Sequence, residues 1–154
     1  MIYLTLQYAA IISALFCVII LLSWYFVPHV WTADLSKGKK KNPKGIDQYV
    51  VVGITILLMF GGPVMLSYQL VEKLEANYWD CFAASFFIQF TIFVVDVLFI
   101  DWFIYMILKP KFMEIEGIER ADDLWYHTKE GLGGLAVGIP ASALAAGIGL
   151  WLAM

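Results

Sequence analysis

The chain has 154 residues, of which 62% are hydrophobic and only 15% are charged. Soluble domains contain roughly 45–50% apolar residues, and a soluble chain this short could not cover its surface with so few charges. The mean hydropathy of +0.79 excludes a disordered chain, a soluble enzyme domain and a nucleic-acid-binding module, which needs a basic face. Cys17 and Cys81 are too few for a disulfide framework or a metal knuckle. We therefore expect a protein whose main solvent is the lipid bilayer.

Four apolar stretches are each long enough to cross a hydrocarbon core of about 30 Å, which takes about 20 apolar residues in a helix. In chain order they run over residues 2–27, 49–70, 79–108 and 132–152. The first lacks the positive flank and the cleavage site of a signal peptide, so we interpret it as a retained helix. Spanning strands would alternate at every second residue. The sequence therefore predicts one all-α domain, a four-transmembrane-helix bundle.

The basic residues predict the orientation of this bundle. Lys73 alone lies in the second loop, whereas the other nine of the ten basic residues lie in the first and third loops. These are Lys37, Lys39, Lys40, Lys41 and Lys44 in the first loop, and Lys109, Lys111, Arg120 and Lys129 in the third. By the positive-inside rule these two loops are cytoplasmic, so both termini lie on the non-cytoplasmic side.

Lysines at this surface also attract anionic lipid headgroups, by about 1 kcal/mol for each basic residue near the membrane. We expect headgroup or phosphate contacts from Lys39, Lys40, Lys41, Lys109 and Lys111. The lipid bilayer is thus the expected partner, and we expect no nucleic-acid partner.

The third span carries the polar residues that a membrane helix tolerates least. Asp96 precedes Lys109 by 13 residues, and so lies about 20 Å deep, near the bilayer centre, whereas Asp101 lies about 12 Å deep. An ionised Asp at the centre costs about 2.5–3.5 kcal/mol, so we expect Asp96 to face the bundle. Gln89 lies seven residues before Asp96, on the same helix face. Because α-helical geometry separates Asp96 and Asp101 by about 140°, we expect them to meet different neighbours.

Two roles remain open for Asp96. It can be a structural tie, hydrogen-bonded to a polar group such as Ser67, Tyr68 or Ser142. Alternatively it can form a proton or cation relay with Asp101 and Gln89.

Two histidines lie at the cytoplasmic ends of the spans, nearest in depth to Asp101. His29 follows the first span and His127 precedes the fourth, and imidazole with carboxylate is the usual material of proton transfer. We expect no direct contact between Asp101 and His127, because their depths differ by about 10–15 Å in straight helices. A pocket shared through water should still bring Asp101 within about 8 Å of at least one histidine.

Small residues recur at every fourth position of the last span, at Gly134, Gly138, Ser142 and Ala146. Such a row lets another helix approach closely, either inside the chain or in a homo-oligomer. Pro140 predicts a kink in this span, and Gly61-Gly62-Pro63 breaks the second. Two helices broken at mid-membrane can enclose a cavity.

A scattered motif runs from the third span to the start of the fourth. It comprises Asp101-Trp102-Phe103, Lys109-Pro110-Lys111-Phe112, Gly117, Tyr126-His127 and Lys129. In this the chain resembles an uncharacterised family of small four-span bacterial membrane proteins with an acid–Trp pair in the third span and a Pro-Lys-Phe exit. The resemblance implies a multi-pass protein of the bacterial inner membrane and supplies no activity. It singles out Asp101, Trp102, Pro110, Lys111, Phe112 and His127.

The sequence contains no nucleotide-binding loop, nucleophile elbow, haem-attachment motif or zinc signature, so we expect neither cofactor nor metal. The leading hypothesis is a transporter-like or accessory protein that handles a proton or cation through Asp96, Asp101 and Gln89. A second is a membrane-embedded enzyme acting on a lipid or isoprenoid, with Asp101, His127 and His29 as catalytic candidates and Lys109 and Lys111 holding a phosphate. A third is an assembly partner of a larger membrane complex.

The orientation leads to the first test. A cysteine introduced into the lysine run at residues 37–44 should react with a membrane-impermeant reagent only from the cytoplasmic side, because nine of ten basic residues share that side. Labelling from outside in intact cells would overturn the orientation.

Overall fold

The computed structural model describes residues 1–31, 45–114 and 124–154, and helices account for nearly all of them. The long helices are α1 (Ile2–Phe26), α3 (Ile46–Leu74), α4 (Tyr78–Val95), its continuation η2 (Asp96–Leu108) and α5 (Leu124–Ala153). Two short 3₁₀ helices follow α1 and η2, namely η1 (Pro28–Trp31) and η3 (Lys111–Met113). No strand occurs in these ranges.

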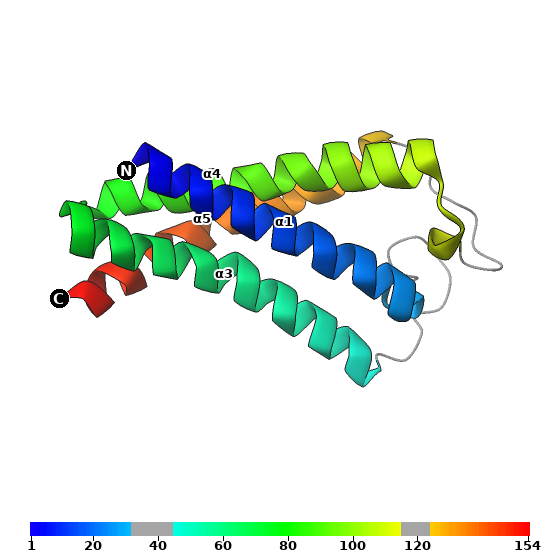
Figure 1. The fold of residues 1–154 in the computed structure, drawn as a ribbon, viewed down its shortest axis with the longest axis horizontal. Coiled ribbons are helices and arrows are strands. Elements are labelled where there is room, and N and C mark those ends of the chain that lie inside the picture. Colours follow the sequence, from blue (N-terminus) through cyan, green and yellow to red (C-terminus); the bar gives the residue numbers. More distant parts are fainter. Residues whose placement is uncertain (32–44, 115–123) are drawn as a thin grey trace.

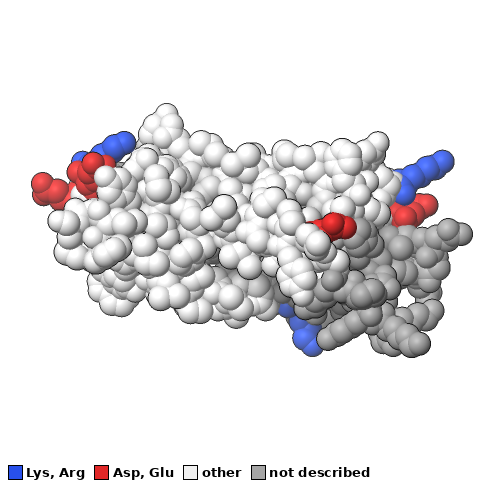
Figure 2. All heavy atoms as spheres, turned by 90° about the horizontal axis from the view of Figure 1, so that it is seen from below, with Lys and Arg blue, Asp and Glu red and all other residues white. Residues whose placement is uncertain are grey.

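The helices form a four-membered bundle in which α4 and η2 act as one span (Figure 1). Among the described residues, four helices are long and apolar enough to cross a membrane: Ile2–Phe26, Ile46–Leu74, Tyr78–Leu108 and His127–Ala153. The predicted four-span, all-α fold class is therefore confirmed. Both termini lie at one end of the bundle (Figure 1), as an even number of spans requires. Figure 2 shows charged atoms of the described residues at both ends of the face in view, with one acidic and one basic patch farther in on the right-hand half.

The last helix begins earlier than its hydropathy indicates. α5 starts at Leu124 instead of residue 132, so its first turns carry His127 and Lys129. Hydropathy marks only the stretch that hydrocarbon can surround, whereas backbone hydrogen bonding continues a helix into the interface. This early start places His127 on a helix and not on a loop.

Small residues hold α3, α4 and α5 together at the end of the bundle that carries the termini. Ser67 of α3 and Ser85 of α4 share a hydrogen bond of 3.1 Å, and Gly149 of α5 packs against Ser67 and against the backbone nitrogen of Tyr68. Asn77 caps α4, accepting hydrogen bonds from the backbone of Trp79 and Asp80. Close approach of helices through small residues is typical of membrane proteins, because helices in lipid gain little from burying apolar side chains against one another.

The four-residue row of α5 is largely used inside the chain. Gly138, Ser142 and Ala146 are buried, and only Gly134 of the row is exposed. Of the two alternatives for this row, the structure thus shows packing within the chain.

α3 packs against the bundle along only part of its length. Its buried residues are Pro63, Leu66, Ser67 and Leu70, so none precedes Pro63. α1, by contrast, has buried residues from Thr5 to Trp24. Figure 1 shows α3 diverging from α4 toward its start. The bundle is therefore tight near the termini and more open at the other end.

The close approach at Gly149 predicts a difference between two glycines of α5. A Cβ at position 149 would lie 2.8 Å from the Tyr68 nitrogen, whereas one at position 147 would meet nothing within 4 Å. Gly149→Ala should therefore destabilise the bundle by about 1–3 kcal/mol relative to Gly147→Ala, as expected for overpacking. Unfolding of both variants in detergent, followed by circular dichroism, measures the difference. Equal stability would show that α3 and α5 are not in close contact at this point.

Candidate functional site

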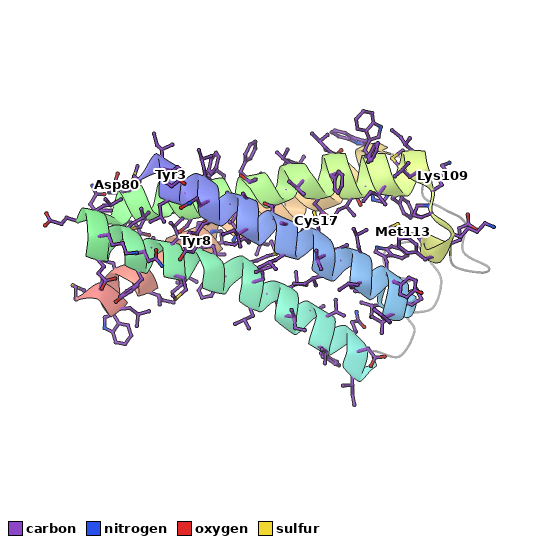
Figure 3. The ribbon with its side chains drawn as sticks, viewed as in Figure 1. Tyr3, Tyr8, Cys17, Asp80, Lys109 and Met113 are labelled. Carbon is purple, nitrogen blue, oxygen red and sulfur yellow. The ribbon has the colours of Figure 1, made fainter. Side chains whose placement is uncertain are left out.

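A cavity of about 270 Å³ lies inside the bundle. All four spans line it: Phe16 of α1, Met59 of α3, Gln89, Ile92, Phe93, Asp96 and Asp101 of α4 and η2, and His127, Gly131, Gly134 and Leu135 of α5. Figure 3 places Cys17, the residue after Phe16, between Asp80 at one end of the third span and Lys109 at the other. The cavity is thus an intramembrane site in which three ionisable side chains meet apolar walls.

Asp101 and His127 are in direct contact in this cavity. Nδ1 of His127 lies 3.6 Å from Oδ2 of Asp101, with the side chains 12% and 22% exposed. The expectation that these residues do not touch is wrong, because α5 begins at Leu124 and carries His127 toward the carboxylate. The expectation of Asp101 within about 8 Å of a histidine is confirmed for His127. The side chain of His29 lies outside the part of the chain that the structure describes.

Aromatic rings hold the imidazole on its other side. The ring of Tyr105 meets that of His127 edge to face, with centroids 5.4 Å apart, and Tyr105 also contacts Trp24 of α1 at 6.0 Å. Tyr105 and Trp24 are both buried. This packing fixes the ring of His127 beside Asp101 and links the site to α1.

The change from α- to π-helix at Asp96 brings the two carboxylates to one cavity. From Asp96 to Leu108 the third span is a π-helix, and at its end the Lys109 N–H donates to the Ile104 carbonyl, five residues back, at 3.0 Å. Because i→i+5 hydrogen bonds define this helix, residues five apart lie about one turn apart. The expected separation of about 140° assumed α-helical geometry, which the third span does not have from Asp96 onward, and both side chains line the same cavity.

Asp96 faces the bundle, as expected from the cost of exposing it to lipid. The structural ties considered for it are not formed with the two serines, since Ser67 pairs with Ser85 and Ser142 donates to the Gly138 carbonyl at 2.7 Å. Within the described ranges no hydrogen bond or ion pair of Asp96 is found. Its carboxylate is thus presented to the cavity and not used as a tie between helices.

Gln89 has a structural task that its sequence position alone does not reveal. Its Nε2 donates to the Met59 carbonyl of α3 at 2.6 Å. Pro63 has no N–H, so it cannot donate to the carbonyl four residues before it, which is that of Met59. Gly138 makes the approach possible, because a Cβ there would lie 3.2 Å from Cβ of Gln89. Gln89 therefore replaces the backbone donor that Pro63 lacks, while its side chain lines the cavity.

The lysines expected to hold a phosphate lie elsewhere. Lys109 ends η2 in a left-handed conformation with φ of 46°, and Lys111 begins η3; both are exposed and neither lines the cavity. Lys39, Lys40 and Lys41 fall outside the described residues. Phe112 packs on Tyr25 of α1 with ring centroids 6.1 Å apart, which anchors η3 to the bundle.

Comparisons with protein-family models, with curated proteins and with solved structures give no match to this chain. Among the residues that the structure describes, no group of three or more His, Cys, Asp and Glu side chains could hold a metal ion.

The pairing of Gln89 with Pro63 predicts an unusual rescue. Gln89→Leu leaves the Met59 carbonyl without its donor and should destabilise the protein by about 1–3 kcal/mol. In a Pro63→Ala background the backbone N–H at position 63 can serve that carbonyl, so the same substitution should cost much less. Unfolding of the four variants in detergent completes the double-mutant cycle. A cost that is equal in both backgrounds would show that Gln89 acts in some other way.

Proposed function

We propose that this small polytopic membrane protein takes up a proton or a cation in an intramembrane cavity and passes it along the third span. The observation that carries the proposal is the meeting of Asp96, Asp101 and His127 in one cavity among apolar side chains. With both carboxylates ionised the site has two negative charges in surroundings that solvate charge poorly. A proton or a cation lowers that cost, whereas an anion raises it.

The arrangement of the three groups supports a sequence of binding steps. Asp101, with His127 beside it, lies nearer Lys109 and the predicted cytoplasmic surface, and Asp96 lies deeper. Beyond Gln89 the third span is closely packed, with Ile88, Ser85 and Cys81 fully buried. The route from the cavity past Gln89 is therefore closed, and release on that side would require the helices to rearrange around Pro63 and Pro140.

The enzyme hypothesis rests on one observation, the contact between His127 and Asp101, which resembles a carboxylate-oriented general base. A phosphorylated lipid would also need basic groups at the cavity, and Lys109 and Lys111 do not line it. Uptake of a proton or cation accounts for both carboxylates and is the function we favour.

We place the protein in the bacterial inner membrane, with its lysine-rich loops in the cytoplasm near anionic headgroups.

Reconstituted protein tests the proposal. Liposomes with an internal pH-sensitive dye and a potassium diffusion potential should acidify faster with the wild-type chain than without it. Asp96→Asn and Asp101→Asn should each lower the protein-dependent rate about tenfold or more, because an amide cannot carry the proton. Sodium or potassium flux in the same vesicles tests inorganic cations.

Glu114→Gln provides the matched control, because this exposed carboxylate follows η3 and does not line the cavity. It should leave the rate unchanged. Asp96→Asn and Asp101→Asn proteins that fold, and that carry protons and cations at the wild-type rate, would eliminate the relay and leave the carboxylates a structural role.

A further inference from the structure

Resting on the proposed function, we propose that the cavity binds an amphipathic organic cation, an ammonium group bearing an aromatic or aliphatic substituent. Three features of the cavity carry this inference: its size, the chemistry of its walls and a gap in its lining at Gly134.

The cavity is larger than a proton relay or a bare inorganic ion requires. Its volume is about 270 Å³, whereas a water molecule occupies about 30 Å³ of liquid. The space is close to the lower end of small-molecule pockets, which begin at about 300 Å³. A metal ion would need several clustered ligands, and in the described part of the chain no group of three or more His, Cys, Asp or Glu side chains could hold one. Size therefore favours a compact organic molecule.

The walls combine apolar surface with negative charge. Phe16, Phe93, Ile92, Met59 and Leu135 supply aromatic and aliphatic surface, and Asp96 and Asp101 supply negative charge. Aromatic rings attract ammonium groups, and carboxylates attract them more strongly. No Lys or Arg occurs among the lining residues that the structure describes. The site therefore matches a cation with an apolar substituent and opposes an anion of the same size.

A gap in the α5 wall offers a way in. Gly134 lines the cavity and is exposed, and a Cβ built on it would meet nothing within 4 Å. Gly131, one turn earlier, is different, because a Cβ there would lie 2.9 Å from Cγ2 of Val97. The lining is thus closed at Gly131 and open at Gly134. An amphipathic cation concentrates at the membrane interface and can reach such an opening from the lipid side.

Binding of two probes of similar size and opposite charge tests the inference. The full chain in zwitterionic nanodiscs is titrated calorimetrically with benzyltrimethylammonium and with benzenesulfonate. Benzyltrimethylammonium should bind about tenfold or more tightly than benzenesulfonate, and Asp96→Asn or Asp101→Asn should weaken it about tenfold or more, an effect equivalent to about 1.4 kcal/mol. A quaternary ammonium carries no exchangeable proton, so the measurement does not depend on proton transfer.

Gly134→Leu and Gly133→Leu form the matched pair that locates the site. Both glycines are exposed with nothing near a built Cβ, but only Gly134 lines the cavity. Gly134→Leu should weaken benzyltrimethylammonium binding about tenfold or more, and Gly133→Leu should leave it unchanged. Circular dichroism and elution volume confirm that the four variants fold.

The outcomes separate this inference from the proposed function. If wild-type vesicles take up protons through Asp96 but the protein binds the two probes equally or not at all, the organic-cation inference is wrong and the proton function stands. Equal effects of Gly134→Leu and Gly133→Leu would also overturn it. Cation binding that depends on Asp96 without any ion flux would instead contradict the proposed function and retain the binding site.

Discussion

A carbonyl without a donor is costly in hydrocarbon, because no water is present to replace the lost hydrogen bond. Pro63 creates such a carbonyl at Met59, and Gln89 of the neighbouring helix supplies the donor. Gln89 can reach it only because Gly138 leaves room beside its side chain. Three residues on three helices are thus joined by one requirement, so each constrains the other two. Every polar group in hydrocarbon needs a hydrogen-bond partner, which also accounts for the bond between the hydroxyls of Ser67 and Ser85.

An unpaired group in hydrocarbon costs more free energy when it is charged, and the fold places its charged side chains together in one cavity. Asp96, Asp101 and His127 share one cavity, so each lies near others that can exchange charge with it. The π-helix makes this possible by turning Asp96 and Asp101 toward the same space. π-Helical geometry is rare and is frequently found at functional sites. Its occurrence at Asp96, where the polar residues of the span begin, links local backbone geometry to the chemistry of the cavity.

The sequence predicted the features that depend on composition along a span. Four helices and a cavity-facing Asp96 follow from hydropathy and from the cost of charge in lipid. The contact between Asp101 and His127 was missed because hydropathy does not show where a helix begins outside hydrocarbon. The shared face of the two aspartates was missed because their angle was calculated for an α-helix. The hydrogen bond of Gln89 could have been predicted from the sequence. A side-chain amide at mid-membrane needs an acceptor, and a proline at mid-membrane leaves the carbonyl four residues before it without a donor.

The position of Pro63 also explains why the cavity lies where it does. No side chain of α3 before Pro63 is buried, whereas after Pro63 the helix packs closely on α4 and α5. Gly62 touches Ile12 of α1 at the same level, so contacts around Gly62 and Pro63 mark where α3 leaves the bundle. Met59 lies about one helical turn before Pro63, at the wall of the cavity. A pivot at Gly61-Gly62-Pro63 would change the distance from Met59 to Asp96 while leaving the pair Ser67–Ser85 in place, and Gln89 would have to follow Met59 or release its carbonyl. Because Met59 forms the α3 part of the cavity wall, the position of α3 before Pro63 bears directly on the space that the carboxylates share.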